Sequence, residues 1–243
     1  MGIRRFLRNW RRSRAVRHVR SVLYEGLTVD ARRSGMIEPI LRQLLQSEYE
    51  RPEINGIAMV VREGDRVLEL GAGLGIISAV AGRAVGPLGR VLSYEANSSL
   101  LADTQAFFSA NGIENVTMVN AVLVNELDPK PRKFHLSGSF AESSLLGVKG
   151  PRAKGSVEVA ANSLSSVLSE FQPDVLICDI EGAELELFPA FPSSNLRAAV
   201  IELHPHRLSP GQIQSIHDGL AAKGLRRQLP GPGGTVEVYT RSP

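Results

Sequence analysis

The segment RVLELGAGLGIISAVAG, at residues 66–82, constrains the fold of this chain more than any other. A short apolar run, Arg66–Leu70, leads into a stretch with glycine at every second position, and a second apolar stretch follows it. Glycine allows the backbone to turn sharply and to approach a ligand closely. A helix N-terminus adds free N–H groups and a positive partial charge. We therefore predict a strand, a ligand-binding turn and a helix, in that order.

The spacing of the glycines separates the cofactor classes. A dinucleotide-binding turn has the pattern G-x-G-x-x-G, but the glycines here are Gly71, Gly73 and Gly75. This G-x-G-x-G pattern, preceded by Glu69, resembles the first motif of Rossmann-like methyltransferases that use S-adenosylmethionine. Glu95 ends the next apolar run, where an acid suits hydrogen bonding to a ribose diol. Taken alone, the glycines could also form a tight turn that serves only packing and binds no ligand.

These positions predict a set of cofactor contacts. We expect Glu69 and the turn Gly71-Ala72-Gly73 with Gly75 to hold the methionine end of S-adenosylmethionine, and Glu95 to hold its ribose. Asn120 follows the third predicted strand, at the turn that lies beside the adenine in this fold. Asn is also a common turn residue without a ligand.

Apolar runs alternate with amphipathic segments from about residue 53 to the C-terminus. Such alternation is typical of βαβ units and of a parallel sheet covered on both faces. Two short extended segments interrupt it, at residues 133–136 and 156–160, and predict either an inserted hairpin or edge strands. The main strands are expected at 66–70, 91–95, 116–119, 174–179, 198–203 and 236–240, and the helices at 53–61, 76–84, 98–110, 164–170 and 211–223.

A group of acids follows the fourth predicted main strand, in the string PDVLICDIEGAELELF. Asp179, Glu181 and Glu184 should meet at the carboxyl end of the sheet, where open α/β sheets bind their ligands. Acids in a first helical turn can also serve only the helix dipole. The next strand ends at His204, before Pro205, and therefore at the same edge.

Several motifs together resemble the FkbM-type methyltransferases. They are Tyr49-Glu50-Arg51-Pro52-Glu53, LELGAGLG at 68–75, Asp179-Ile180-Glu181-Gly182-Ala183-Glu184 and Ile201-Glu202-Leu203-His204. The resemblance covers roughly residues 47–205. It implies a Rossmann-like class I methyltransferase fold, with a mostly parallel seven-stranded sheet and helices on both faces. It also implies S-adenosylmethionine as donor and O-methylation of an alcohol on a sugar, polyketide or similar small or glycan acceptor.

Two mechanisms are consistent with these residues. His204 could take the hydroxyl proton as a general base, with Asp179 or Glu181 orienting it or the acceptor. Alternatively, Asp179, Glu181 and His204 could bind a divalent metal that lowers the hydroxyl pKa. We predict the first arrangement, without a metal.

The N-terminus differs in charge from the rest of the chain. Residues 1–50 contain eleven basic and five acidic side chains, and the remainder is mildly acidic. We predict a basic helical arm at 1–46 and a methyltransferase domain at 47–243. The arm suits packing on the domain, an anionic membrane surface or another polyanion. A mitochondrial-type presequence is also compatible with the composition of the arm.

Composition excludes some classes of protein. The longest apolar runs are too short for a membrane span. A single cysteine, Cys178, excludes an internal disulfide framework and permits a reducing compartment. We therefore expect a cytoplasmic protein, with peripheral membrane attachment through the arm as an option.

Three other functions are compatible with parts of the sequence. They are an RNA methyltransferase that uses the arm, a non-catalytic adenosyl-binding module and, against the glycine spacing, an NAD-dependent oxidoreductase.

Overall fold

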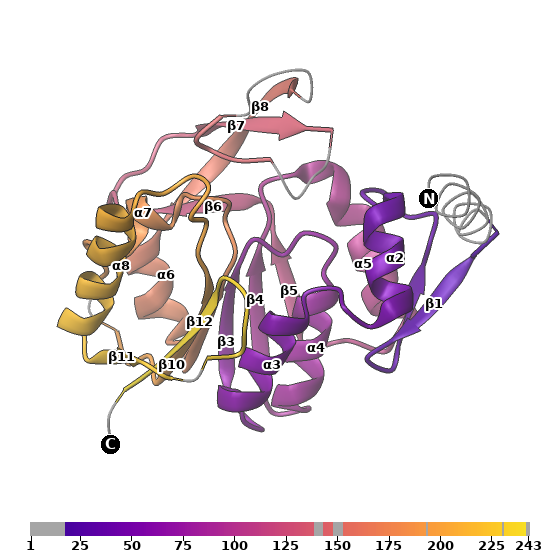
Figure 1. Ribbon diagram of the computed structural model, residues 1–243, viewed down its shortest axis with the longest axis horizontal. Helices are drawn as coiled ribbons and strands as arrows, with labels where there is room; N and C mark the ends of the chain where they lie inside the picture. The colour runs from indigo at the N-terminus through magenta and orange to yellow at the C-terminus, as the bar shows by residue number, and fades with distance from the viewer. Residues whose placement is uncertain (1–17, 139–142, 148–152, 193, 230, 242–243) are drawn as a thin grey trace, which may run out of the picture.

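Seven strands form the central sheet of the computed structural model (Figure 1). The structure describes residues 18–138, 143–147, 153–192, 194–229 and 231–241. The strand order is β11-β12-β10-β9-β3-β4-β5, and only β12 runs against its neighbours. This arrangement confirms the predicted mostly parallel seven-stranded sheet. The strands are β3 Arg66–Leu70, β4 Arg90–Tyr94, β5 Val116–Val119, β9 Val175–Cys178, β10 Ala198–Glu202, β11 Leu225–Arg227 and β12 Val236–Arg241.

Helices cover both faces of this sheet, because successive strand side chains point to opposite faces. Val67, Val175 and Val200 pack with α2 to α5 in one core cluster. Their neighbours Leu68 and Leu176 pack with α6 to α8 in the other. The helices are α2 Glu38–Gln46, α3 Arg51–Val60, α4 Ile76–Val85, α5 Leu101–Ala110, α6 Leu164–Phe171, α7 Glu184–Leu187 and α8 Pro210–Ala222, with a 3-10 turn, η1, at Ser98–Leu100.

A second sheet of three strands lies beyond one end of the main sheet, at the top of Figure 1. Its order is β6-β8-β7, with β6 at Ala121–Val124, β7 at Arg132–Ser137 and β8 at Ala153–Ser163. Strands β7 and β8 pair antiparallel, which confirms the predicted inserted hairpin. Strand β6 was not predicted, because it follows β5 after a single residue and its run AVLV lacks turn signals of its own.

The N-terminal region differs from the predicted arm. Residues 21–30 form a hairpin of β1 (Ser21–Tyr24) and β2 (Leu27–Asp30), and helix α2 follows. Tyr24 and Leu27 are buried in the same core cluster as the first strand of the main sheet. The predicted boundary at residue 46 is therefore wrong, because this hairpin belongs to the domain. The arginine-rich residues 1–17, which carry the predicted basic helix, lie outside the described residues.

Within the described ranges, no helix has both the length and the apolar character needed to cross a bilayer.

Candidate active site

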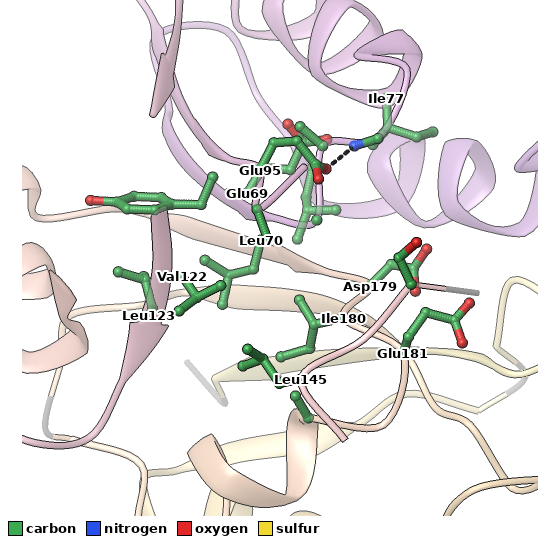
Figure 2. A pocket seen from close by; sticks show the side chains of 18 of the residues that line it. Glu69, Leu70, Ile77, Glu95, Val122, Leu123, Leu145, Asp179, Ile180 and Glu181 are labelled. Carbon is green, nitrogen blue, oxygen red and sulfur yellow. Dashed lines mark hydrogen bonds between the residues drawn. The ribbon is translucent and has the colours of Figure 1, made fainter. Parts of the chain in front are cut away.

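One cavity opens at the carboxyl ends of β3, β4 and β9, and its empty volume out to solvent is about 1150 Å³. Figure 2 shows two unlike walls. Val122, Leu123 and Leu145 form an apolar wall from the small sheet and the loop beside it. Asp179 and Glu181 extend from the other side. A cavity of this size and position is the usual ligand site of an open α/β sheet.

The glycine turn lines the cavity, and neither Gly71 nor Gly75 has space for a side chain. Gly71, Gly73 and Gly75 all have positive φ, at 88°, 51° and 72°. A Cβ on Gly71 would lie 1.7 Å from the carbonyl oxygen of Asp179. The N–H groups of Gly71 and Ala72 donate to the carbonyl of Tyr94, at 2.9 and 3.1 Å, which ties the turn to the end of β4. The predicted turn is therefore held against the end of β4, and Gly71 packs directly against the backbone of Asp179 after β9.

Glu95 reaches back to this turn from the end of β4. Its Oε2 accepts a hydrogen bond from Gly73 N–H at 2.7 Å, and its Oε1 accepts one from Asn97 N–H at 2.6 Å. Burial raises the pKa of Glu95, and the two backbone bonds oppose that effect. Each carboxylate oxygen retains a second acceptor position, and Glu95 lines the cavity. These residues fit an adenosyl donor, because the turn is open to a ligand and the acid beside it can accept ribose hydroxyls.

Glu69 is buried at the cavity and is held by two serine hydroxyls. It lines the cavity but is only 1% exposed, and its Oε2 accepts hydrogen bonds from the hydroxyls of Ser78 and Ser93. Burial raises the pKa of Glu69 to about 7. Its Oε1 has no hydrogen-bond partner among the described residues. Glu69 thus braces β3 against α4 and β4, and a contact with the methionine end remains a prediction.

The buried Glu69 carboxyl makes a prediction for stability. Its pKa is raised in the fold, so its contribution is fully present below the unfolded value near pH 4.5 and is lost as the pH rises through about 7. A shift of this size corresponds to about 3 kcal/mol. Glu69→Gln should flatten the decline of the free energy of unfolding between pH 4.5 and 8, as measured by urea denaturation. An unchanged pH slope would show that Glu69 ionises freely in the native state.

Asn120 is exposed and is not among the cavity-lining residues. Its amide donates to the carbonyls of Glu95 and Ala96, at 2.8 and 3.1 Å. Asn120 therefore fixes the turn that carries Glu95, and its predicted contact with the adenine is not tested.

The predicted acids and the histidine do meet. His204 Nδ1 lies 3.0 Å from Glu184 Oε1, and His204 Nε2 lies 3.4 Å from Asp179 Oδ1 and 3.7 Å from Glu181 Oε1. Arg207 adds a cation, with its Nε 3.2 Å from Glu181 Oε2. Glu184 is fully buried, whereas Asp179 and Glu181 line the cavity. Three acids from the turn after β9 therefore surround one imidazole at the end of β10.

The surroundings of His204 bear on its predicted role as general base. Burial alone would lower its pKa, but the carboxylates of Asp179 and Glu184 beside it raise the pKa to about 11. The imidazole is 4% exposed and is not among the residues that line the cavity. At neutral pH it is a cation between acids, with no free nitrogen for an acceptor proton. The predicted role of His204 as general base stays a prediction that this geometry does not favour.

Glu181 has the properties that were expected of the histidine. Burial raises the pKa of Glu181 to about 7, against the opposing charge of His204. It lines the cavity, and its backbone has a φ of 54°, which is uncommon for a residue other than glycine. Strained residues of this kind often belong to functional sites.

The sequence did not assign roles to a second group of acids. Glu50, just before α3, and Glu53, in its first turn, line the cavity beside Tyr49. Glu202 at the end of β10 approaches both. The motifs Tyr49–Glu53 and Ile201–His204 already pointed to these positions through the family resemblance, but nothing in their spacing showed that they would meet.

The fold and the site together define a class of enzyme. The strand order, the G-x-G-x-G turn after the first strand of the main sheet and the acid after the next one are those of a class I methyltransferase that uses S-adenosylmethionine. The model of the methyltransferase FkbM domain matches residues 69–223. The chain belongs to this FkbM methyltransferase family, and it is an S-adenosylmethionine-dependent enzyme.

Other known proteins are similar over smaller parts or at lower identity. Protein-L-isoaspartate O-methyltransferase 2 of Archaeoglobus fulgidus is 41% identical over 59 residues, which are 24% of this chain and 27% of that protein. The chain therefore matches about a quarter of the length of this relative.

Solved structures are similar at low sequence identity. The structure of precorrin-6y C5,15-methyltransferase from Geobacter metallireducens GS-15 is 13% identical, with 81% of this chain and 89% of that one covered and a TM-score of 0.49. Aeropyrum pernix fibrillarin, in complex with natively bound S-adenosyl-L-methionine, is 16% identical, with coverages of 92% and 82% and a TM-score of 0.43.

Proposed function

We propose that this enzyme methylates a hydroxyl group of a sugar, polyketide or similar small or glycan acceptor. The observation that carries the proposal is the position of Glu181, a carboxylate on the cavity wall with a pKa near 7. An aliphatic hydroxyl is a weak nucleophile, so it needs a base in reach whose pKa is close to the working pH. Glu181 meets both conditions.

The residues around Glu181 define its role. Bound S-adenosylmethionine supplies an electrophilic methyl carbon. As the acceptor oxygen bonds to that carbon, the methyl–sulfur bond would break and S-adenosylhomocysteine would leave. Glu181 would accept the proton of the hydroxyl, and Asp179 would orient the hydroxyl beside it. His204 and Arg207 contact Glu181 and hold its carboxylate in place. Glu184 is fully buried and contacts Nδ1 of His204, the ring nitrogen other than the one that lies near Glu181.

The charge of the cavity favours a small acceptor over RNA. Glu50, Glu53, Asp179 and Glu181 all line it, and its described lining residues include no lysine or arginine. Binding of a phosphate backbone depends on such basic side chains, so this lining does not favour RNA. The basic residues 1–17 could still attach the enzyme to an anionic membrane surface or another polyanion, and this remains a separate proposal for the arm.

A transfer assay tests the proposed function. The purified full chain is incubated with labelled S-adenosylmethionine and with separate pools of glycan, polyketide and RNA acceptors, and products are identified by mass. We expect a gain of one methyl group on oxygen in a glycan or polyketide pool. Methylation confined to RNA, or to nitrogen, would contradict the proposal.

His204 gives a prediction for the pH profile. The positive charge of His204 lowers the pKa of Glu181, so His204→Gln should raise that pKa. The base is active when deprotonated, and activity is lost as the pH falls through its pKa. The acid limb of the turnover profile should therefore move from near pH 7 to a higher pH in His204→Gln. His217→Gln, far from the cavity, is the control. If the acid limb of the His204→Gln profile stays near pH 7, His204 does not position Glu181.

A further inference from the structure

Three carboxylates outside the proposed proton-transfer group meet beside the cavity, and Glu50 and Glu53 also line it. One oxygen from each of Glu50, Glu53 and Glu202 lies within 4.8 Å of the others. Glu53 is 5% exposed, and its Oε2 has no hydrogen-bond partner in the part of the chain that is described. The group therefore includes an acidic side chain that is almost completely buried and has one oxygen without a partner among the described residues.

The fold holds this group in place. Glu50 has a φ of 45° and precedes α3, which begins at Arg51 with Pro52 in its first turn. Helix α3 packs closely on β10, since a Cβ on Gly56 would lie 2.6 Å from Val200 Cγ1. This close packing brings the first turn of α3 next to Glu202. The hydroxyl of Thr235 donates to Glu202 Oε1 at 2.7 Å and fixes that side chain.

The charge of this group is not balanced by protein cations. Among the described residues, no ion pair joins Glu50, Glu53 or Glu202 to a lysine, arginine or histidine. Glu181 and Glu184, by contrast, both contact His204. Buried carboxylates in proteins are paired, protonated or bound to a metal.

We infer that Glu50, Glu53 and Glu202 bind one divalent cation that prefers oxygen ligands, such as Mg²⁺ or Mn²⁺. Such ions take carboxylate oxygens at about 2.0–2.6 Å, so ligands on opposite sides of the ion are about 4–5 Å apart. The three oxygens all lie within 4.8 Å of one another, close enough to share one such ion. The ion would neutralise the acidic wall and offer open positions to acceptor oxygens. This site differs from a metal held by Asp179, Glu181 and His204, and it goes beyond the proposed function.

A second set of possible ligands shares Glu202. Asp179, Glu202 and His204 also have ligand atoms within 4.8 Å of one another. His204 already contacts Glu184 and Asp179, one with each ring nitrogen, whereas Glu53 Oε2 contacts no donor. The observations therefore favour the set that contains Glu53, and variants of Glu53 and His204 separate the two.

Manganese titration tests the inference without any methyl donor. Free Mn²⁺ is measured by electron paramagnetic resonance as it is added to the full chain. We expect one saturable site per chain, with an affinity that falls at least ~10-fold in Glu53→Gln and in Glu202→Gln. Glu48→Gln, the same change on an exposed acid of the preceding turn, should leave binding unchanged. His204→Gln should change it by less than about twofold.

Several results would overturn the inference. The first is the absence of a saturable Mn²⁺ site in the unmodified chain. The second is full affinity for Mn²⁺ in both Glu53→Gln and Glu202→Gln. The third is loss of Mn²⁺ binding in His204→Gln together with full affinity in Glu53→Gln. Circular dichroism checks that each variant is folded. If Glu53→Gln does not fold, the Mn²⁺ affinity of Glu202→Gln decides the test. Because the donor is absent, a failure here leaves the proposed methyl transfer standing, and a failure of transfer leaves this site standing.

Discussion

Gly71→Ala is expected to raise the Kd for S-adenosylhomocysteine at least ~100-fold, as measured by calorimetry, and to lower the free energy of unfolding by about 2–4 kcal/mol. The new Cβ would lie 1.7 Å from the carbonyl oxygen of Asp179, which is backbone and cannot move aside cheaply. A φ of 88° adds strain for any residue with a side chain. Either the glycine turn or the end of β9 must therefore shift, and both border the cavity.

Gly64→Ala is the matched control for this change. Gly64 has nearly the same φ, 85°, but a Cβ there would meet nothing within 4 Å. Gly64→Ala should lower the free energy of unfolding by about 1 kcal/mol through backbone strain and leave the Kd for S-adenosylhomocysteine unchanged. Equal effects of the two substitutions on the Kd would show that backbone conformation, and not the contact with Asp179, explains the loss.

Glu181→Gln is expected to lower turnover by about 10²–10⁴-fold, because the variant has no base for the acceptor proton. The Kd for S-adenosylhomocysteine should stay within about twofold, since Glu95 and the glycine turn are unchanged. The remaining activity should also lose the acid limb near pH 7 that the raised pKa of Glu181 gives to the unmodified enzyme.

The control for Glu181→Gln is Glu114→Gln, which removes an exposed acid that does not line the cavity. Its turnover and pH profile should match those of the unmodified chain. If Glu181→Gln retains full turnover with an unchanged profile, Glu181 is not the base. If the loss appears in the Kd for the donor instead, the carboxylate belongs to the donor site.

Much of the central sheet could be predicted because its pattern is local. Strand β3 and the glycine turn carry their own signals, and Ser209-Pro210 predicts the start of α8, where the structure shows a capping box between Ser209 and Gln212. Strand β11 has only three residues, too few for a pattern. The hairpin at residues 21–30 was interpreted as helix, because its apolar residues also fit helical spacing and its two strands have four residues each.

The site was predictable only where strand ends define it. Glu95 and Asp179 follow buried strands, so topology alone places them at one edge of the sheet. The exchange of roles between His204 and Glu181 depends on which side chain reaches the cavity, and sequence spacing does not contain that information. Glu53 and Glu202 meet because α3 packs against β10 through Gly56, a contact between residues far apart in the chain.

A crystal structure of the full chain with S-adenosylhomocysteine tests the central claim most directly. We predict ribose hydroxyls within hydrogen-bond distance of Glu95, the nucleoside over the glycine turn, and the sulfur facing Asp179 and Glu181. A ligand bound elsewhere, or bound with its sulfur turned away from these two carboxylates, would contradict the account.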